Sequence, residues 1–253
     1  MKKKAPTHDK LAIEYVTEFN VNADGTDFIT SQDTSESGYF SHHKAMELFD
    51  VSKNFTVNGV GYHLPTLAEF RGIVPDYNSG MNISFEYEKK VDNLSEEITI
   101  AGNTQTYTSD YVSLGNNNAY GIRFKGNGDK QRSAWRYQSV KNPDSEGEMM
   151  LMITVRYLGP ENLDVTTDDI SNEEWWEKDS EDNIVRCFPA AGFVRYTTDG
   201  YYTQIGTHGY FWTSTDFNAG NARSMDYTPM GSYTAYYWNS KSYEFSVRLF
   251  SNK

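Results

Sequence analysis

Apolar residues recur at helical spacing in two short segments of the first third of the chain. In the first segment, "SHHKAMELFD", Ser41 has the side chain of an N-cap, and Ala45, Leu48 and Phe49 would share one face of a helix. The sequence therefore predicts a short amphipathic helix that begins after Ser41.

The second segment, "HLPTLAEFRGIVP", carries signals for both ends of a helix. Thr66 suits the N-cap, and Glu69 three residues later completes a capping box. The predicted apolar stripe consists of Leu67, Phe70 and Val74. Because proline cannot continue a helix, we expect this helix to end at Pro75.

A third helix is expected inside an acidic stretch, residues 160–183. In "SNEEWWEK", Ser171 and Glu174 form a second capping box, with Trp175 and Trp176 inside the helix. The acidic stretch lies between strand-like runs, so we interpret it as an insertion and not as a domain boundary.

The rest of the chain alternates between strand-like runs and polar turns. "LAIEYVTEF" near the start is rich in β-branched and aromatic residues, and the turn signal Asp24-Gly25 follows it. The later runs are "NAYGIRFKG", "SAWRYQSV", "MMLMITVRYLG", "AAGFVRYT", "YFWTST", "ARSMDYT", "YTAYYW" and "YEFSVRLF". No repeat or linker divides the chain, so residues 1–253 are predicted to form one α+β domain.

Composition and charge narrow the class of protein. Apolar residues make up 38% of the chain, but aromatic residues reach 15% and can supply the core, since each buries about 150–250 Å². The net charge of −12 and the scattered Lys and Arg argue against nucleic-acid binding, which needs a basic face. No segment approaches 18 apolar residues, so no membrane-spanning segment is expected.

The first residues and the single cysteine bear on the cellular setting. "MKKKAPTHDK" has the positive charge of a secretory leader without its apolar region, so residues 1–9 are expected to be a disordered remnant of a leader. Cys187 cannot form an intrachain disulfide, and its apolar neighbours favour a small buried side chain over a nucleophile. The five histidines show no metal-binding spacing, and His42 and His43 are expected to face solvent or cap a turn.

Three blocks together resemble a known family. "HLPTLAEFRGIV" is similar to a helix start found in formylglycine-generating-enzyme-like proteins and in the fibrobacter-type major paralogous (FISUMP) domains of Bacteroidetes surface proteins. "FPAAGFVRYTTDGYYTQIGTHGYFWTST" and the closing "EFSVRLF" resemble later blocks of the second group, in the same order. The resemblance implies a C-type-lectin-like α+β fold: two or three short helices packed on twisted antiparallel sheets, with long loops and neighbouring termini.

The enzyme and metal classes related to this fold are not favoured. Formylglycine-generating oxidases resemble the chain in the Leu-Pro-Thr helix, but they rely on a cysteine pair. Calcium-dependent animal lectins use motifs that "GPENLD", "KNPDSE" and "YWNSK" match only in part, so no metal site and no cofactor is predicted. A glycosidase needs two suitably placed carboxylates, and none of the 35 acidic residues stands out by its sequence setting.

The function expected from the resemblance is noncatalytic binding or adhesion by an exported protein or lipoprotein at a bacterial cell surface or outer membrane. The candidate ligand is a glycan or a surface protein, and the candidate ligand-binding residues lie in turn-rich sequence near the end of the chain. They are Asp216, Asn218, Asn221, Arg223, Tyr236, Trp238, Asn239 and Lys241. Two alternatives stay open: a structural fimbrial or cell-envelope subunit that assembles with protein partners, and a divergent glycoside-active enzyme.

The aromatic residues of "HGYFWTSTDF" could either bind a sugar at the surface or pack in the core. Strand alternation places Tyr210 and Trp212 on one face and Phe211 on the other. The resemblance places this run on a central strand, so Trp212 is expected to anchor the core and to deliver the loop at Asp216 to the surface.

Overall fold

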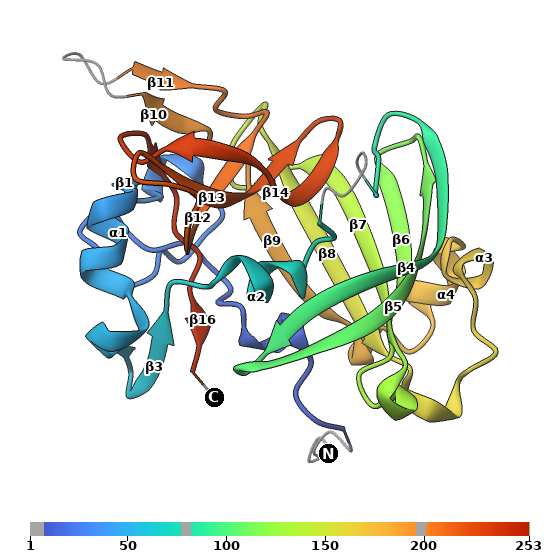
Figure 1. Ribbon diagram of the computed structural model, residues 1–253. Coiled ribbons are helices and arrows are strands. Elements are labelled where there is room, and N and C mark those ends of the chain that lie inside the picture. Colours follow the sequence, from blue (N-terminus) through green and yellow to red (C-terminus); the bar gives the residue numbers. More distant parts are fainter. Residues whose placement is uncertain (1–7, 77–81, 196–200, 253) are drawn as a thin grey trace.

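The computed structural model describes residues 8–76, 82–195 and 201–252, and for residues 201–202 and 232–238 it describes the strand but not the side chains. These residues form antiparallel sheets joined by a few short helices (Figure 1). The α+β class predicted from the sequence is therefore confirmed. Most of the predicted leader remnant, residues 1–9, lies outside the described residues.

The largest element is a six-stranded antiparallel sheet in which each strand pairs with the next one along the chain. Its strands are β4 (Glu88–Ile100), β5 (Asn103–Leu114), β6 (Asn118–Lys125), β7 (Ser133–Lys141), β8 (Met149–Tyr157) and β9 (Ile184–Pro189). The runs predicted for β6, β7 and β8 are confirmed, whereas β4, β5 and β9 were not predicted. Ala101 and Gly102 close the β4–β5 hairpin with φ values of 49° and 79°.

Three smaller sheets complete the fold. The first contains β1 (Phe40–Ser41), β15 (Glu244–Phe245), β10 (Phe193–Arg195) and β11 (Tyr201–Thr203). The second contains β12 (Gly209–Asp216), β13 (Asn221–Thr228) and β14 (Gly231–Ser240). The third contains β16 (Phe250–Ser251), β3 (Val60–His63) and β2 (Phe55–Val57). The closing run "YEFSVRLF", predicted as one strand, instead supplies β15 and part of β16.

The two early helices form where the capping signals predicted them. α1 (His42–Phe49) begins after Ser41, whose hydroxyl accepts a hydrogen bond from the Lys44 amide. α2 (Leu67–Arg71) has the predicted Thr66–Glu69 capping box. The predicted end at Pro75 is wrong, because α2 ends at Arg71 and the next residues form turns that still bury Ile73 and Val74.

The first predicted strand is also wrong. Residues 12–15 of "LAIEYVTEF" form a 3-10 helix, η1 (Ala12–Tyr15), and only Val16 makes an isolated bridge, to Phe250. The apolar residues of this segment are buried in the core, so their apolar pattern reflects core packing and not a strand. The other short 3-10 helices are η2 (Thr34–Glu36), η3 (Val51–Lys53), η4 (Asn127–Asp129), η5 (Gly159–Glu161) and η6 (Ser180–Asp182).

Strand β12 carries the aromatic run and separates two hydrophobic clusters. Phe211 faces the larger cluster, with Phe70 and Trp135, and Trp212 faces the smaller one. The Trp212 ring stacks on Phe245 with a centroid distance of 4.1 Å, and its indole N–H donates to the Phe40 carbonyl at 2.8 Å. The predicted core role of Trp212 is confirmed. β12 lies at the edge of its three-stranded sheet, and its other side makes isolated parallel bridges to Gly192 and Ser246.

The acidic stretch between β8 and β9 is held to the sheet by arginine and tryptophan. It contains α3 (Thr167–Ile170) and α4 (Glu173–Glu177). The Arg156 guanidinium lies 4.3 Å from the Trp175 ring centroid and donates to the carbonyls of Trp175 and Trp176 at 2.8 Å. The predicted Ser171 cap is wrong: Asn172 caps α4, because Ser171 already ends α3.

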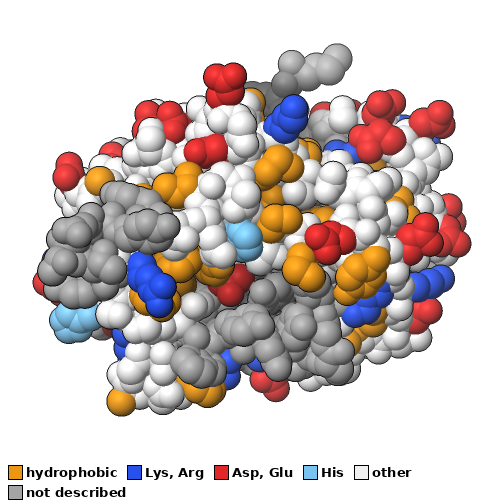
Figure 2. All heavy atoms as spheres, turned by 90° about the horizontal axis from the view of Figure 1, so that it is seen from above, with side chains coloured by type: hydrophobic (Ala, Val, Ile, Leu, Met, Phe, Trp, Pro, Cys, Tyr) orange, Lys and Arg blue, Asp and Glu red, His pale blue; other side chains and the backbone are white. Residues whose placement is uncertain are grey.

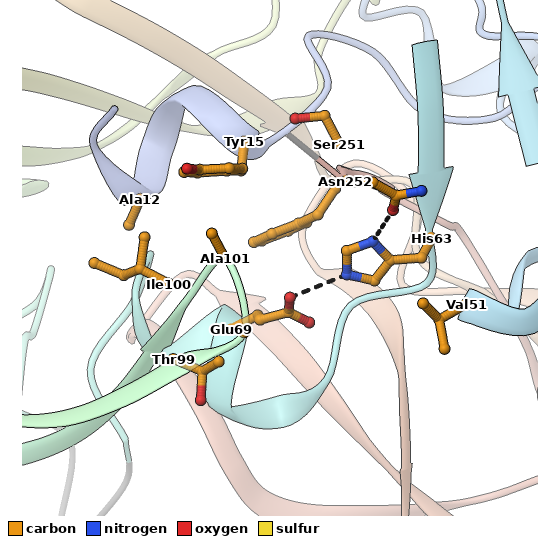
Figure 3. Close-up of a pocket in the computed structure, with 12 residues that line it drawn as sticks. Ala12, Tyr15, Val51, His63, Glu69, Thr99, Ile100, Ala101, Ser251 and Asn252 are labelled. Carbon is orange, nitrogen blue, oxygen red and sulfur yellow. Dashed lines mark hydrogen bonds and ion pairs between the residues drawn. The ribbon is translucent and has the colours of Figure 1, made fainter. Parts of the chain in front are cut away.

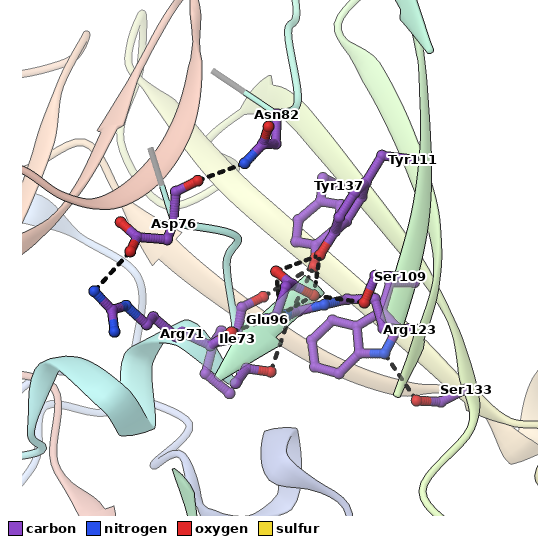
Figure 4. A network of polar contacts seen from close by, with 12 residues as sticks. Arg71, Ile73, Asp76, Asn82, Glu96, Ser109, Tyr111, Arg123, Ser133 and Tyr137 are labelled. Carbon is purple, nitrogen blue, oxygen red and sulfur yellow. Dashed lines mark hydrogen bonds and ion pairs between the residues drawn. The ribbon is translucent and has the colours of Figure 1, made fainter. Parts of the chain in front are cut away.

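A buried polar network joins α2 to the six-stranded sheet (Figure 4). The fully buried Arg123 donates to the carbonyls of Arg71 and Gly72 and forms an ion pair with Glu96 at 3.3 Å. The hydroxyls of Ser109 and Tyr111 also donate to the Glu96 carboxylate. Burial lowers the pKa of Arg123, but the Glu96 charge outweighs it and the net pKa is raised. Glu96 therefore serves as the internal counter-ion of Arg123.

One face of the molecule carries charged side chains of both signs (Figure 2). In Figure 2, which shows the molecule of Figure 1 from above, acidic side chains are spread over the face and the coloured basic side chains stand apart from one another. None of the helices in the described ranges is long and apolar enough to span a bilayer.

Candidate functional site

Two adjoining cavities lie where the N-terminal segment, the β4–β5 turn and the C-terminal strand meet. Figure 3 shows residues that line the first of them. Cavity A has a volume of about 270 Å³, and cavity B has a volume of about 620 Å³. Tyr15, Ile100 and Ala101 line both cavities. We call the two together the groove. Its size is that of small-molecule pockets, which enclose roughly 300–1,000 Å³.

Several chain segments build the groove. η1 supplies Tyr15, the β4–β5 turn supplies Ala101, and β16 brings Ser251 to the same wall. On the far side, His63 at the end of β3 and Glu69 on α2 face the turn (Figure 3). Lys10 ties the first segment to the last, since its ammonium donates to the Ser251 hydroxyl at 3.0 Å.

The polar groups of cavity A are engaged with one another. His63 Nε2 lies 3.0 Å from Glu69 Oε1, and His63 Nδ1 lies 2.7 Å from Asn252 Oδ1. The second Glu69 oxygen accepts from the backbone N–H and hydroxyl of Thr66. Because both ring nitrogens face oxygen acceptors, this arrangement fits a doubly protonated imidazolium.

The electrostatics of the pair agree with that geometry. Burial lowers the pKa of His63, but the hydrogen bond and charge of Glu69 outweigh it, so the net pKa lies above the ordinary value. Burial likewise raises the pKa of Glu69, but the contacts with His63 and Thr66 outweigh it and lower the net pKa. The pair is therefore a largely buried ion pair that joins the end of β3 to α2, and Asn252, just after β16, is bonded to the same imidazole.

The remaining wall of cavity A is mainly hydrocarbon. Ala12, Val51, Ile100 and Phe250 contribute to it together with the Tyr15 ring. Val51 is 64% exposed, so this part of the wall meets solvent at the cavity mouth.

Cavity B has a different chemistry, rich in amides. Its polar lining consists of Asp9, Lys10, Asn103, Gln105, Asn127, Lys130 and Gln131. The hydroxyl of Tyr107 donates to Gln105 at 3.0 Å, and Asn127 donates to the Thr106 carbonyl at 3.2 Å. Within the described part of the chain, the amides of Asn103 and Gln131 make no side-chain hydrogen bond.

Burial shifts the pKa of two ionisable side chains in the groove. The Lys10 ammonium lies 4.1 Å from the Tyr15 ring centroid, and burial lowers its pKa. Burial also raises the pKa of the Tyr15 phenol, so this hydroxyl stays protonated at neutral pH and can both donate and accept.

The residues predicted from the sequence as ligand-binding gather at a different place, the end of the β12–β13–β14 sheet. Asp216 ends β12 and pairs with Lys241 at 2.7 Å. Asn218 in the following turn accepts hydrogen bonds from the Gly220 amide and from the Asn221 side chain at 3.0 Å. These polar groups thus stabilise their own turn.

The other predicted residues lie on β13 and β14. The Arg223 guanidinium lies 4.4 Å from the Phe217 ring centroid, and Asn239 donates to the Ser224 hydroxyl at 3.0 Å. Tyr236 and Trp238 belong to β14, but their side chains lie outside the described residues. The structure brings the segments of this predicted site together, and its ligand-binding role stays a prediction.

The burial of His42, His43 and Cys187 can be compared with what the sequence predicted. His42 was expected to face solvent or cap a turn, but it is buried: its Nε2 lies 3.0 Å from the Thr213 carbonyl and its ring meets Trp212 edge-on. His43 is exposed, as expected. Cys187 is half-buried, and burial raises the pKa of its thiol, which disfavours the nucleophilic thiolate.

The groove was not predicted, because its residues come from segments more than 200 positions apart in the sequence. One local signal was present. Asn103, Gln105 and Tyr107 alternate along one strand and therefore share a face. Among the described residues there is no group of three His, Cys, Asp or Glu that could hold a metal ion.

Fold and groove together define an antiparallel α+β protein with a two-part surface cavity. A family model described as a domain of unknown function, DUF8237, matches residues 8–250, nearly the whole chain. The protein therefore belongs to the DUF8237 family. No curated protein and no solved structure matches the chain.

Proposed function

We propose that this protein is a noncatalytic binding module that holds a carbohydrate in the groove. The observation that carries the proposal is the lining of cavity B, where four amides and the ring of Tyr15 surround one open space, and the hydroxyl of the buried Tyr107 holds Gln105. Amide groups both donate and accept hydrogen bonds, as sugar hydroxyls do, and tyrosine rings pack against the C–H faces of sugars.

The way these amides are held supports binding. Gln105 and Asn127 are fixed by hydrogen bonds to the protein, so they lose little freedom when a ligand arrives. Asn103 and Gln131 keep their amides available to a ligand. Cavity B also lies on a strand and a short turn, which is a stiffer support than a long loop.

The proposal includes a C-type-lectin-like fold of the FISUMP kind and a location at the bacterial cell surface after export. Two early helices that contact β12, and the neighbouring N-terminal and C-terminal segments, support this fold. In that arrangement the six-stranded sheet lies between α2 and β10 in the chain and provides the turn that walls the groove.

A glycan array screened with the purified full chain tests the proposal. We expect binding to a limited set of sugars, with weaker binding by the double variant Asn103→Ala/Gln131→Ala. Loss of two ligand hydrogen bonds of about 1 kcal/mol each corresponds to roughly a 30-fold loss of affinity. The amide deletions leave the internal hydrogen bonds of the groove in place, so folding should be preserved.

A second double variant, Asp216→Ala/Lys241→Ala, removes an ion pair at the end of the β12–β13–β14 sheet and serves as the matched control. It should retain the wild-type array signal if the sugar sits in the groove. If the control variant loses the signal and the groove variant keeps it, the site predicted from the sequence is correct instead. Concentration-dependent assembly with no array signal would favour the structural-subunit alternative.

A further inference from the structure

We infer that the ligand is an amphipathic glycoside, a sugar that carries an apolar substituent, with the sugar in cavity B and the substituent in cavity A. The inference rests on the proposed carbohydrate function and specifies its ligand class. Its basis is the opposite chemistry of two cavities that share a wall.

Cavity A offers little to a polar ligand. Its charged groups, His63 and Glu69, already satisfy each other, and their remaining sites are taken by Asn252 and by the Thr66 cap. The Thr99 hydroxyl contacts the Thr104 hydroxyl, and the Ser251 hydroxyl accepts from Lys10. Most of the remaining lining is carbon, including the exposed side chain of Val51. Moving an apolar group from water onto such a surface is favourable, because it lowers the free energy of the system.

The wall shared by the two cavities indicates that one continuous ligand could occupy both. Tyr15, Ile100 and Ala101 line both cavities, so a molecule lying across them occupies A and B without a break. Ile100 and Ala101 present only carbon atoms in their side chains, which suits the junction between a sugar ring and its substituent. Tyr15 adds a ring face and a hydroxyl at the same junction.

The test compares methyl and octyl glycosides of the same sugar by isothermal titration against the full chain. The panel contains glucose, galactose, mannose and N-acetylglucosamine, and each octyl glycoside is kept below its critical micelle concentration. We expect at least one sugar for which the octyl glycoside binds about tenfold or more tightly than the methyl glycoside. That ratio corresponds to moving about two methylene groups out of water.

A pair of variants at the mouth of cavity A makes the comparison specific. Val51→Ser should reduce the octyl-to-methyl affinity ratio at least threefold and leave methyl glycoside binding unchanged, whereas Val51→Leu should keep the ratio. The exposed position of Val51 makes both variants compatible with folding. A phenyl glycoside distinguishes an aromatic substituent from an alkyl chain as the preferred apolar group.

The outcomes separate the inference from the proposed function. If methyl glycosides bind and the octyl ratio is near one, or the ratio is the same in Val51→Ser, the amphipathic ligand class is overturned and the carbohydrate function stands. If no glycoside of the panel binds, the carbohydrate function is overturned, and the ligand class falls with it.

Discussion

Replacing Trp212 by phenylalanine isolates what the buried indole contributes to the fold. Trp212 is fully buried, stacks on Phe245, and donates to the Phe40 carbonyl. Phenylalanine keeps an aromatic ring but leaves that carbonyl without its donor and opens a small void. An unsatisfied buried acceptor costs about 1–3 kcal/mol, so we expect the free energy of unfolding to fall by about 2–3 kcal/mol.

Urea unfolding followed by circular dichroism measures this change, with Phe217→Ala as the control. Phe217 lies five residues later, is 43% exposed, and contacts the Arg223 guanidinium, an interaction of about 0.5–1 kcal/mol. The control should therefore lose about 1 kcal/mol or less. A cost below about 0.5 kcal/mol for Trp212→Phe would refute the assignment of Trp212 to the core.

Three further predictions concern backbone strain and pH. Ala101→Asn should raise the free energy of unfolding in urea by about 1 kcal/mol, because alanine at a φ of 49° is strained and asparagine tolerates that region; no gain would mean an unstrained turn. Burial raises the pKa of Asp226 to about 7, so stability should fall as pH rises from about 4 through 7. In Asp226→Asn this part of the pH dependence should disappear, and an unchanged pH profile would contradict the burial of the charge. The pKa of His63 is raised when the protein is folded, so its stabilisation is complete below about pH 6.5 and is lost as pH rises through the folded pKa. His63→Gln should therefore destabilise the protein in urea at pH 6 and much less at pH 9, and an equal cost at both would count against the ion pair.

Local signals predicted the helices better than the sheets. Thr66 and Glu69 lie three residues apart, so the capping box needs no distant partner and forms as the sequence indicates. The end of α2 depends on tertiary packing instead, because Val74 is buried outside the helix.

The β4–β5 hairpin escaped prediction for a physical reason. β4 is rich in charged residues, and the inward position of Glu96 interrupts the apolar alternation. Only the structure shows that Arg123, 27 residues later, neutralises this carboxylate. Because a buried ion pair places a charged residue on the inner face of β4, the hydrophobic pattern does not identify this strand.

The groove could not be predicted from the sequence because the residues that line it are far apart along the chain. Lys10 and Ser251 are hydrogen-bonded neighbours, but no local pattern relates the two ends of the chain. The turn-rich segment from Asp216 to Lys241 was selected because its polar residues are close in sequence. The structure shows that several of them hydrogen-bond to one another.

Mapping amide chemical shifts on the isotope-labelled protein, with the sugar found on the array, tests most directly where the ligand binds. We predict that the largest changes occur at Gly102, Asn103, Asn127 and Gln131, which surround cavity B or its turn. Changes confined to residues 216–223 and 239–241, with none around the groove, would contradict the account.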